Sequence, residues 1–407
     1  MDRDVVVIGA GPAGSVAAAM LAERGYSVEV LARALFPRFS VGESLLPQSM
    51  VFLEEAGLLD VVQREGFQLK NGAIFRRGPE EQVFDLSEKT AEGWAITYQV
   101  ARDRFDLVLA QGAAEKGAVL SFGEQVTDFT PGDKQVRLTV RSDSGAERRL
   151  TARFALDASG FGRVLARLLD LDRPSDLLRR RSVFTHVEDH IPPDAYDRNK
   201  VLISVHPHDP AIWYWLIPLK GGISSIGVVG LEATIEAAGG DDEARLQLFV
   251  SSSGRMGELL ANAERIRPVD SITGYSCSVK CLFGQGYAML GNAAEFLDPI
   301  FSSGVTIALK SATLASSALS RHLDGQAVDW QQDYVAPLST GIETFRAFVE
   351  AWYDGSLQRI IFRQPSEANR IRRLIISVLA GYAWDADNPF VQNPHRYLAL
   401  VRDQCGE

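Results

Sequence analysis

The sequence predicts an α/β fold of three parts: a three-layer domain with a mainly parallel sheet, an antiparallel sheet beside it, and a C-terminal helical region. An apolar strand, a glycine-rich turn and an alanine-rich helix follow one another at the N-terminus, which is the order of a parallel βαβ unit. Apolar runs with period two fill the middle of the chain, as in antiparallel strands. From about Trp330 onward the pattern is helical and amphipathic.

The N-terminal unit has a strand at residues 4–8, a glycine-rich turn at residues 9–14 and a helix that continues to residue 24. Gly25 stands where a glycine commonly ends a helix, and residues 26–31 form a second strand. The turn reads GxGxxG, which is a weak pattern alone and a strong one between a strand and a helix. This segment therefore predicts a dinucleotide site.

Each residue of the turn has an expected role. Gly9 permits the tight turn, Gly11 lets the backbone approach a pyrophosphate, and Gly14 lets the helix pack on the strand. Pro12 and Ala13 begin the helix, whose free N–H groups and partial positive charge favour phosphates. These five residues form the predicted phosphate loop.

The acidic residue that normally ends the second strand is missing. Ala32 stands where a carboxylate would bind the adenosine ribose, and Arg33 follows it as a further expected cofactor contact. Loss of a hydrogen bond to a charged group costs about 1.5–3 kcal/mol. The sequence therefore predicts a loosely held cofactor.

Composition indicates an ordinary globular protein. The chain has 407 residues, of which 46% are apolar and 23% charged, and its net charge of −10 argues against general affinity for nucleic acid. Cys277, Cys281 and Cys405 have no CxxC spacing and are interpreted as reduced thiols. The apolar run at residues 5–21 contains glycines and lacks a basic flank, so we expect no signal peptide, no integral membrane segment and a cytoplasmic location.

Residues 213–218 read Trp-Tyr-Trp-Leu-Ile-Pro, which we call the WxWxIP hexad. As a strand it would place Trp213, Trp215 and Ile217 on one face and the two residues between them on the other. Taken alone, two indoles side by side are also what a plain hydrophobic core contains. The other motifs decide between these interpretations.

The chain resembles the para-hydroxybenzoate-hydroxylase-like FAD enzymes over at least residues 1–320. Three signatures carry the resemblance: the GxGxxG turn, the Asp157-Ala158-Ser159-Gly160 turn, and a late loop at residues 291–304. Residues 36–47 are similar to the flavin-side loop of the halogenase-like branch, and residues 99–106 to its W-x-V-x-R-x-x-F-D pattern. The WxWxIP hexad is the hallmark of flavin-dependent halogenases.

The resemblance implies a set of FAD contacts beyond the phosphate loop. They come from the flavin-side loop, from the arginine of the second pattern, and from the two later turns. The residues are Glu43, Ser44, Arg102, Asp157, Gly291, Asn292, Asp298, Gly304 and Val305. Chloride or bromide would bind at the backbone N–H groups of Ser303 and Gly304, at the start of a helix that continues to about residue 319.

The family chemistry implied is oxidation of the halide. Reduced FAD and oxygen form a flavin hydroperoxide, the halide attacks it, and hypohalous acid travels through a tunnel to a lysine beside an electron-rich aromatic. Lys70 matches that lysine, and Trp213 and Trp215 would keep substrate away from the flavin. Desolvation would lower the pKa of a tunnel lysine. The alternative for Lys70 is a solvated side chain at the start of a strand.

Three departures bear on cofactor and substrate. Besides Ala32, Asn292 replaces an aspartate that contacts the flavin ribitol, and Phe301 stands where tryptophan halogenases carry a catalytic glutamate. Free tryptophan is therefore not the expected substrate; a phenol or pyrrole, on its own or tethered to an acyl or peptidyl carrier protein, is favoured. Because no second GxGxxG follows a strand, a partner flavin reductase is expected to supply reduced FAD, although NADPH could dock transiently.

Two other function classes stay open. The chain could be an FAD-dependent monooxygenase or reductase without halogenation, or a weakly FAD-binding, non-catalytic homologue, as Ala32 and Asn292 suggest. No metal site is predicted, because Glu188, His190 and the pair His206 and His208 lack a third ligand at a recognised spacing.

Basic clusters at residues 179–181 and 370–373 are interpreted as solvated helix faces, or as docking sites for an acidic carrier protein. Pro365 and Pro389 are expected to break the C-terminal helices, and Trp352, Tyr353 and Tyr382 to line the site. The predicted FAD-binding domain comprises residues 1–75, 100–180 and 275–330. The substrate-side antiparallel sheet comprises residues 76–99 and 181–274, and the C-terminal helical cap residues 331–407.

Overall fold

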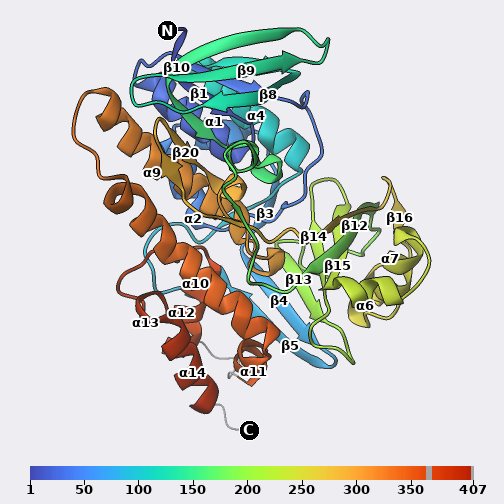
Figure 1. Cartoon of the computed structure of the whole chain (residues 1–407). Helices are drawn as coiled ribbons and strands as arrows, with labels where there is room; N and C mark the ends of the chain where they lie inside the picture. The colour runs from blue at the N-terminus through green and yellow to red at the C-terminus, as the bar shows by residue number, and fades with distance from the viewer. Residues whose placement is uncertain (364–368, 405–407) are drawn as a thin grey trace.

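The computed structural model describes residues 1–363 and 369–404, so Pro365 and Cys405 lie outside the described residues. The predicted α/β fold is confirmed, and Figure 1 shows its three parts: the N-terminal sheet domain, a second sheet, and the C-terminal helices. The first sheet is parallel through its centre, in the order β20 (Tyr287–Met289), β10 (Glu147–Asp157), β1 (Arg3–Ile8), β2 (Val28–Ala32) and β7 (Val119–Phe122).

Three layers form because β1 alternates its side chains between two apolar surfaces. Val5 and Val7 pack with the helical layer, whereas Val6 and Ile8 face an antiparallel layer. The helical layer consists of α1 (Pro12–Glu23), α4 (Arg102–Glu115) and α9 (Ser303–Leu323), and α1 contacts the other two. The antiparallel layer consists of β8 (Glu124–Thr130), β9 (Val136–Ser142) and the first half of β10. The carboxyl ends of β1 and β10 thereby meet the start of α1.

The second sheet lies beside this domain (Figure 1). Its order is β16 (Glu264–Arg265), β12 (Arg180–Glu188), β15 (Ile223–Leu231), β14 (Trp213–Pro218), β13 (Lys200–Val205), β4 (Gly72–Arg77) and β5 (Glu80–Asp85), with β17 (Asp270–Thr273) also on β12. One pair departs from the expected antiparallel pattern, because β13 and β4 run parallel. The sheet also begins before the predicted boundary at residue 75, since β4 starts at Gly72. Helices α6 (Glu232–Ala237), α7 (Asp242–Ser251) and α8 (Arg255–Leu259) cover its outer face.

Short elements connect the two sheets. They are α2 (Gln48–Glu55), α3 (Leu59–Arg64), the two-stranded ladder of β3 (Gln68–Lys70) and β6 (Thr97–Gln99), α5 (Val164–Leu168), and the pair of β11 (Asp172–Arg173) and β18 (Ser278–Val279). The short strand β19 (Phe283–Gly284) pairs with β20.

The C-terminal region is helical, as predicted. It contains α10 (Ala336–Tyr353), α11 (Ser356–Arg363), α12 (Arg370–Leu379), α13 (Pro389–Gln392) and α14 (Pro394–Gln404). Helix α10 packs on α9 and thereby joins this region to the first domain. Pro389 begins α13, because its missing N–H is not needed in the first turn of a helix. Along the described part of the chain, no helix combines the length and apolar character that crossing a membrane requires.

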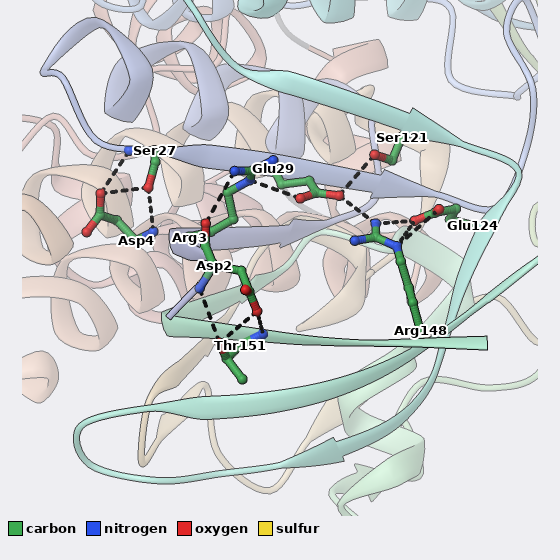
Figure 2. A network of polar contacts seen from close by, with 9 residues as sticks. All are labelled: Asp2, Arg3, Asp4, Ser27, Glu29, Ser121, Glu124, Arg148 and Thr151. Carbon is green, nitrogen blue, oxygen red and sulfur yellow. Dashed lines mark hydrogen bonds and ion pairs between the residues drawn. The ribbon is translucent and has the colours of Figure 1, made fainter.

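A polar network joins the amino-terminal ends of the parallel strands (Figure 2). The glycine-rich turn lies at the opposite end of β1. At the centre of the network the buried Glu29 accepts hydrogen bonds from Arg3 Nε at 3.0 Å, Arg148 Nη2 at 2.5 Å and Ser121 Oγ at 3.0 Å. Burial alone would raise the pKa of Glu29, but the hydrogen bond and charge of Arg148 lower it below its usual range. The ionised carboxylate therefore stabilises the fold.

We expect Glu29→Gln to lower the free energy of unfolding at pH 7 by about 1–3 kcal/mol, the cost of losing hydrogen bonds to a buried charged group. The folded-state pKa of Glu29 is depressed, so this contribution is present above the unfolded pKa and is lost as the pH falls through the folded value. The free energies of unfolding of the wild type and Glu29→Gln, measured with urea, should therefore differ at pH 7 and converge near pH 3. Glu147→Gln, which breaks an exposed pair with Arg141, is the control. Equal losses for both variants would contradict the assignment.

Candidate active site

The phosphate loop has the geometry that a dinucleotide requires. Gly9 has a φ of +106°, and a Cβ there would lie 2.4 Å from the carbonyl oxygen of Ala158. A Cβ on Gly14 would lie 1.9 Å from the carbonyl oxygen of Gly9, so helix and strand pack too closely for any side chain. A Cβ on Gly11, in contrast, would meet nothing nearer than Arg38 Nη2 at 3.7 Å. The open side of Gly11, at the N-terminus of α1, fits the pyrophosphate of FAD.

The end of β2 has no carboxylate to offer a ribose. Ala32 is buried at the last position of that strand, and Arg33 is exposed just beyond it. The Arg38 guanidinium lies instead beside the open face of Gly11. Sequence analysis did not select this residue as a cofactor contact. Its cation adds positive charge where phosphates would bind.

Arg102 holds the flavin-side loop in place. Its Nη1 donates to the carbonyl oxygens of Val41 and Gly42 at 2.8 and 3.2 Å, and its Nε donates to Asp106 Oδ1 at 2.8 Å. The other oxygen of Asp106 accepts from Arg38 at 3.3 Å. Arg102 therefore fixes the loop against α4, which brings the loop and the phosphate-binding turn together.

Glu43 points toward the second sheet. Its buried Oε1 lies 2.6 Å from Nε2 of His186, a residue of β12 that sequence analysis did not select. The ring of Phe39 lies edge-on to the same imidazole, at 5.5 Å between centroids. The expected FAD contact of Glu43 stays a prediction; what the structure assigns to this side chain is a link between the flavin-side loop and the second sheet.

The Asp157 turn and the late loop are held by internal contacts. Asp157 accepts hydrogen bonds from the backbone N–H of Ser159 at 3.0 Å and of Leu165 at 2.7 Å, and burial raises its pKa. Both its oxygens thus shape the turn. A Cβ on Gly291 would lie 2.9 Å from the Cβ of Ala308, so the late loop packs tightly on α9. The next residue, Asn292, is half-buried in the same short turn.

Asp298 joins the late loop to the WxWxIP hexad. Its Oδ2 accepts from the hydroxyls of Tyr353 at 3.0 Å and Tyr275 at 3.2 Å, and its Oδ1 accepts from the N–H of Ile300. The Tyr353 hydroxyl in turn accepts from Trp213 Nε1 at 2.9 Å. Burial raises the pKa of Asp298. The expected FAD contact of Asp298 stays a prediction; in the structure its carboxylate belongs to this network, which sets the position of the loop before α9.

We expect Tyr353→Phe to lower the free energy of unfolding by about 1–3 kcal/mol, because Asp298 loses a donor and Trp213 loses an acceptor inside the protein. The late loop would then shift, and catalytic turnover should fall by about tenfold, the effect of roughly 1.4 kcal/mol. Urea denaturation and turnover measure the two effects. Tyr196→Phe is the control, since its hydroxyl is bonded to the carbonyl of Lys200 in the second sheet. An equal loss of turnover in both variants would contradict a specific role for Tyr353.

Helix α9 begins in this loop, at Ser303. The preceding residue, Ser302, has a φ of +58°, and within the described residues no side chain caps the helix. The first-turn N–H groups at Ser303, Gly304 and Val305 therefore have no partner inside the helix. A Cβ on Gly304 would lie 3.0 Å from the ring of Phe296, so this ring packs closely against the backbone of Gly304. This N-terminus suits the predicted halide.

The two tryptophans of the hexad lie on the face that was predicted, within one apolar cluster, and Tyr214 and Leu216 lie in another. Their rings are tilted by 44° with centroids 5.9 Å apart. Trp215 Nε1 donates to Ser225 Oγ at 3.1 Å. Both indoles are thus buried, and each is also fixed by one polar contact. Together they form a buried aromatic wall, which is compatible with both the core and the functional interpretation of the hexad.

Aromatic residues from other elements extend this wall. Trp352 of α10 packs against Phe75 of β4 and edge-on against Phe301, both with centroids 5.9 Å apart. Phe301 thus fills an apolar position rather than an acidic one. Tyr382, which was grouped with Trp352 and Tyr353, donates instead to the carbonyl oxygen of Trp94.

Lys70 is buried, with 3% of its surface exposed, and lies at the end of β3. Its Nζ donates to Ser44 Oγ at 2.7 Å and to the carbonyl oxygen of Leu45 at 2.9 Å, both in the flavin-side loop. Burial lowers its pKa to about 7. The alternative of a solvated lysine is wrong.

Comparisons with known proteins identify the family of the chain. A family model described as an FAD binding domain matches residues 2–335. The 1H-pyrrole-2-carbonyl-(peptidyl-carrier protein) chlorinase of Pseudomonas fluorescens is 30% identical, with 93% of this chain and 89% of that protein covered. The chain belongs to the flavin-dependent halogenase family. Its members include the flavin-dependent brominase Bmp2, whose structure is 25% identical with a TM-score of 0.83, covering 99% of this chain and 100% of that one.

A second solved structure is more similar still. A protein from Cytophaga hutchinsonii described as a flavoprotein/dehydrogenase is 40% identical with a TM-score of 0.96, covering 100% of this chain and 99% of that one. This chain of the halogenase family is therefore also similar to a protein that is described more broadly, as a flavoprotein/dehydrogenase.

The two basic clusters of this halogenase-family chain differ from expectation. Arg180 is buried at the start of β12, where its guanidinium lies 3.3 Å from the centroid of the Tyr353 ring. Arg372 is buried in α12 and lies over the ring of Phe84. The expectation of two solvated helix faces is therefore wrong for the central arginine of each cluster. Among the residues that the structure describes, no three His, Cys, Asp or Glu side chains lie close enough to hold a metal ion.

Proposed function

We propose that this protein halogenates an electron-rich aromatic, a pyrrole or phenol tethered to a carrier protein, with reduced FAD from a partner reductase, oxygen, and chloride or bromide. Two observations favour this substrate class. The Pseudomonas relative is a chlorinase of a pyrrole-2-carbonyl group on a peptidyl-carrier protein. Phe301 gives the wall an apolar surface, which suits an uncharged ring.

The chain's own residues fit FAD. The open face of Gly11, the N-terminus of α1 and Arg38 would hold its pyrophosphate, and the N-terminus of α9 would lie at the isoalloxazine and halide. When bound in reduced form, FAD supplies the activated oxygen that oxidises the halide. The absence of a ribose-binding carboxylate at Ala32 supports exchange of FAD with a reductase, because it weakens one contact to the cofactor.

The observation that carries the proposal is the buried amine of Lys70. A pKa of about 7 leaves a substantial part of this amine neutral at physiological pH, so it can act as a nucleophile toward hypohalous acid or as a hydrogen-bond donor to it. Ser44 and Leu45 fix its position relative to the flavin-side loop. Trp213 and Trp215, held by Tyr353 and Ser225, would keep the aromatic substrate away from the cofactor.

The test is reconstitution with FAD, a flavin reductase, NADH and either halide. The substrate is pyrrole-2-carbonyl on a peptidyl-carrier protein, with free phenols and pyrroles for comparison. Mass spectrometry should show the halogen isotope pattern on the tethered pyrrole. A monooxygenase or reductase is the second candidate, favoured by the description of the Cytophaga neighbour as a flavoprotein/dehydrogenase. Hydroxylated products alone, or NADH oxidation without any product, would support that candidate and overturn halogenation.

A further inference from the structure

The β3–β6 ladder has one polar, buried face next to Lys70. Lys70 lies directly opposite Thr97, and Gln68 opposite Gln99. Side chains of directly opposed residues in antiparallel strands share a face, and so do residues two apart in one strand. Lys70, Thr97, Gln68 and Gln99 therefore share the inner face, on which Gln68 is half-buried and the other three are buried. Leu69, between these positions, is 46% exposed on the outer face.

The ammonium of Lys70 is only partly satisfied by the protein. A lysine has three donors, and two of them are used by Ser44 Oγ and the carbonyl oxygen of Leu45. Within residues 1–363 and 369–404 the third N–H has no partner, so it can bond to a guest.

Thr97 and Gln99 offer two oxygens on that face. Both residues are fully buried, and in the described ranges 1–363 and 369–404 neither Thr97 Oγ1 nor Gln99 Oε1 has a hydrogen-bond partner. The Gln99 amide cannot be turned over without loss, because its Nε2 donates to the carbonyl oxygens of Leu69 at 3.2 Å and Arg198 at 2.8 Å. Two unpartnered buried oxygens cost free energy, so a guest that bonds to them is favoured.

We propose that Thr97 and Gln99, together with Lys70, form the receptor that holds hypohalous acid. This inference rests on the proposed halogenase function. The oxygen of the acid accepts the third N–H of Lys70 and the O–H of Thr97, and the O–H of the acid donates to Gln99 Oε1. The oxygen of the guest carries one O–H donor and two lone pairs, which match the three groups that Lys70, Thr97 and Gln99 leave free. Thr97 and Gln99 form no bond to the halogen; they keep the acid at the lysine instead of releasing it.

The test compares Thr97→Val with Thr97→Ser, which keeps the hydroxyl, and with Thr185→Val. Thr185 is also a buried strand threonine, but its Oγ1 is bonded to the carbonyl oxygen of Arg267 at 2.9 Å. Each protein receives FAD, a reductase, NADH, bromide and the tethered pyrrole, with monochlorodimedone in solution to trap escaping hypobromous acid. Brominated pyrrole and trapped bromine are both measured per NADH consumed.

We expect Thr97→Val to lower the brominated pyrrole by about tenfold, the effect of losing one net hydrogen bond, and to raise the trapped bromine. Thr97→Ser and Thr185→Val should keep the wild-type ratio of product to trapped bromine. An unchanged ratio in Thr97→Val would overturn the receptor, while a wild-type protein that yields neither product nor trapped bromine would overturn the proposed function itself.

A second measurement needs no turnover. Because the Thr97 hydroxyl has no partner among the residues that the structure describes, Thr97→Val should leave the urea midpoint of the FAD-free protein unchanged or raise it, whereas Thr185→Val should lower it. A midpoint lowered as much in Thr97→Val as in Thr185→Val would show that the hydroxyl already has a structural partner, and would overturn the proposal.

Discussion

Lys70→Met is expected to lower halogenation by at least about a hundredfold, while NADH consumption continues because oxygen still reoxidises the reduced FAD. Methionine fills a similar volume but provides neither a nucleophile nor a donor, and loss of a group that acts directly on the reacting species commonly costs about 10²-fold or more. The phosphate loop, the α9 N-terminus and Arg38 are untouched, so FAD binding should persist. Product by mass spectrometry and NADH consumption by absorbance measure the two effects separately.

Lys200→Met is the matched control for this substitution. Lys200 is a largely buried lysine on β13 whose Nζ bonds to Asn71 Oδ1 and Asp197 Oδ2, whereas Lys70 bonds to the flavin-side loop. Its loss should leave the ratio of product to NADH unchanged. Halogenation at the wild-type ratio in Lys70→Met would remove Lys70 from the reaction.

The same substitution should change how stability depends on pH. Burial lowers the pKa of Lys70 to about 7 in the folded protein, whereas the unfolded chain has an ordinary lysine pKa near 10.4. Between these values the unfolded state binds a proton that the folded state does not, so wild-type stability gains up to about 1.4 kcal/mol per pH unit from this group. Lys70→Met lacks that term. The free energy of unfolding of Lys70→Met, measured with urea, should exceed that of the wild type most below pH 7, and this difference should shrink from pH 7 to 9. A constant difference would contradict the depressed pKa of Lys70.

The fold and the strand–turn–helix unit around the glycine-rich turn could be predicted because their signals are local. Gly9, Gly11 and Gly14 lie within six residues of one another, and strand, turn and helix around them follow from short patterns. The alternation of the WxWxIP hexad likewise fixed which face each indole takes once the segment was a strand. These features need no knowledge of how distant segments meet.

The polar links between distant segments could not be predicted. Trp213 and Tyr353 are 140 positions apart, and Glu43 and His186 are 143 apart, so their pairing depends on how the two sheets and α10 pack. Arg372 is different, because a signal was present. It lies three and four positions before Ile375 and Ile376, on the apolar stripe of α12, and only its basic neighbours made it look solvated.

A pair of glycine substitutions should separate the structural from the cofactor-binding role of the phosphate loop. In Gly14→Ala the new Cβ would lie 1.9 Å from the backbone oxygen of Gly9, so strand and helix must move apart. Forcing a methyl group into such a packed contact costs about 1–3 kcal/mol, and more where backbone cannot yield. We expect a loss of about 3 kcal/mol or more in urea denaturation of the FAD-free protein, and no measurable FAD binding.

Gly11→Ala should behave in the opposite way without cofactor. Its Cβ would meet nothing nearer than Arg38 Nη2 at 3.7 Å, and Gly11 has a φ of −73° that alanine adopts freely. At this N-cap position the cost to stability should stay below about 1 kcal/mol. The same methyl group would occupy the space through which a pyrophosphate reaches the N–H groups of α1, so FAD affinity by fluorescence titration should fall by about tenfold or more, equivalent to 1.4 kcal/mol. If Gly11→Ala binds FAD as tightly as the wild type, the pyrophosphate does not lie on this turn, and the cofactor site must be placed elsewhere.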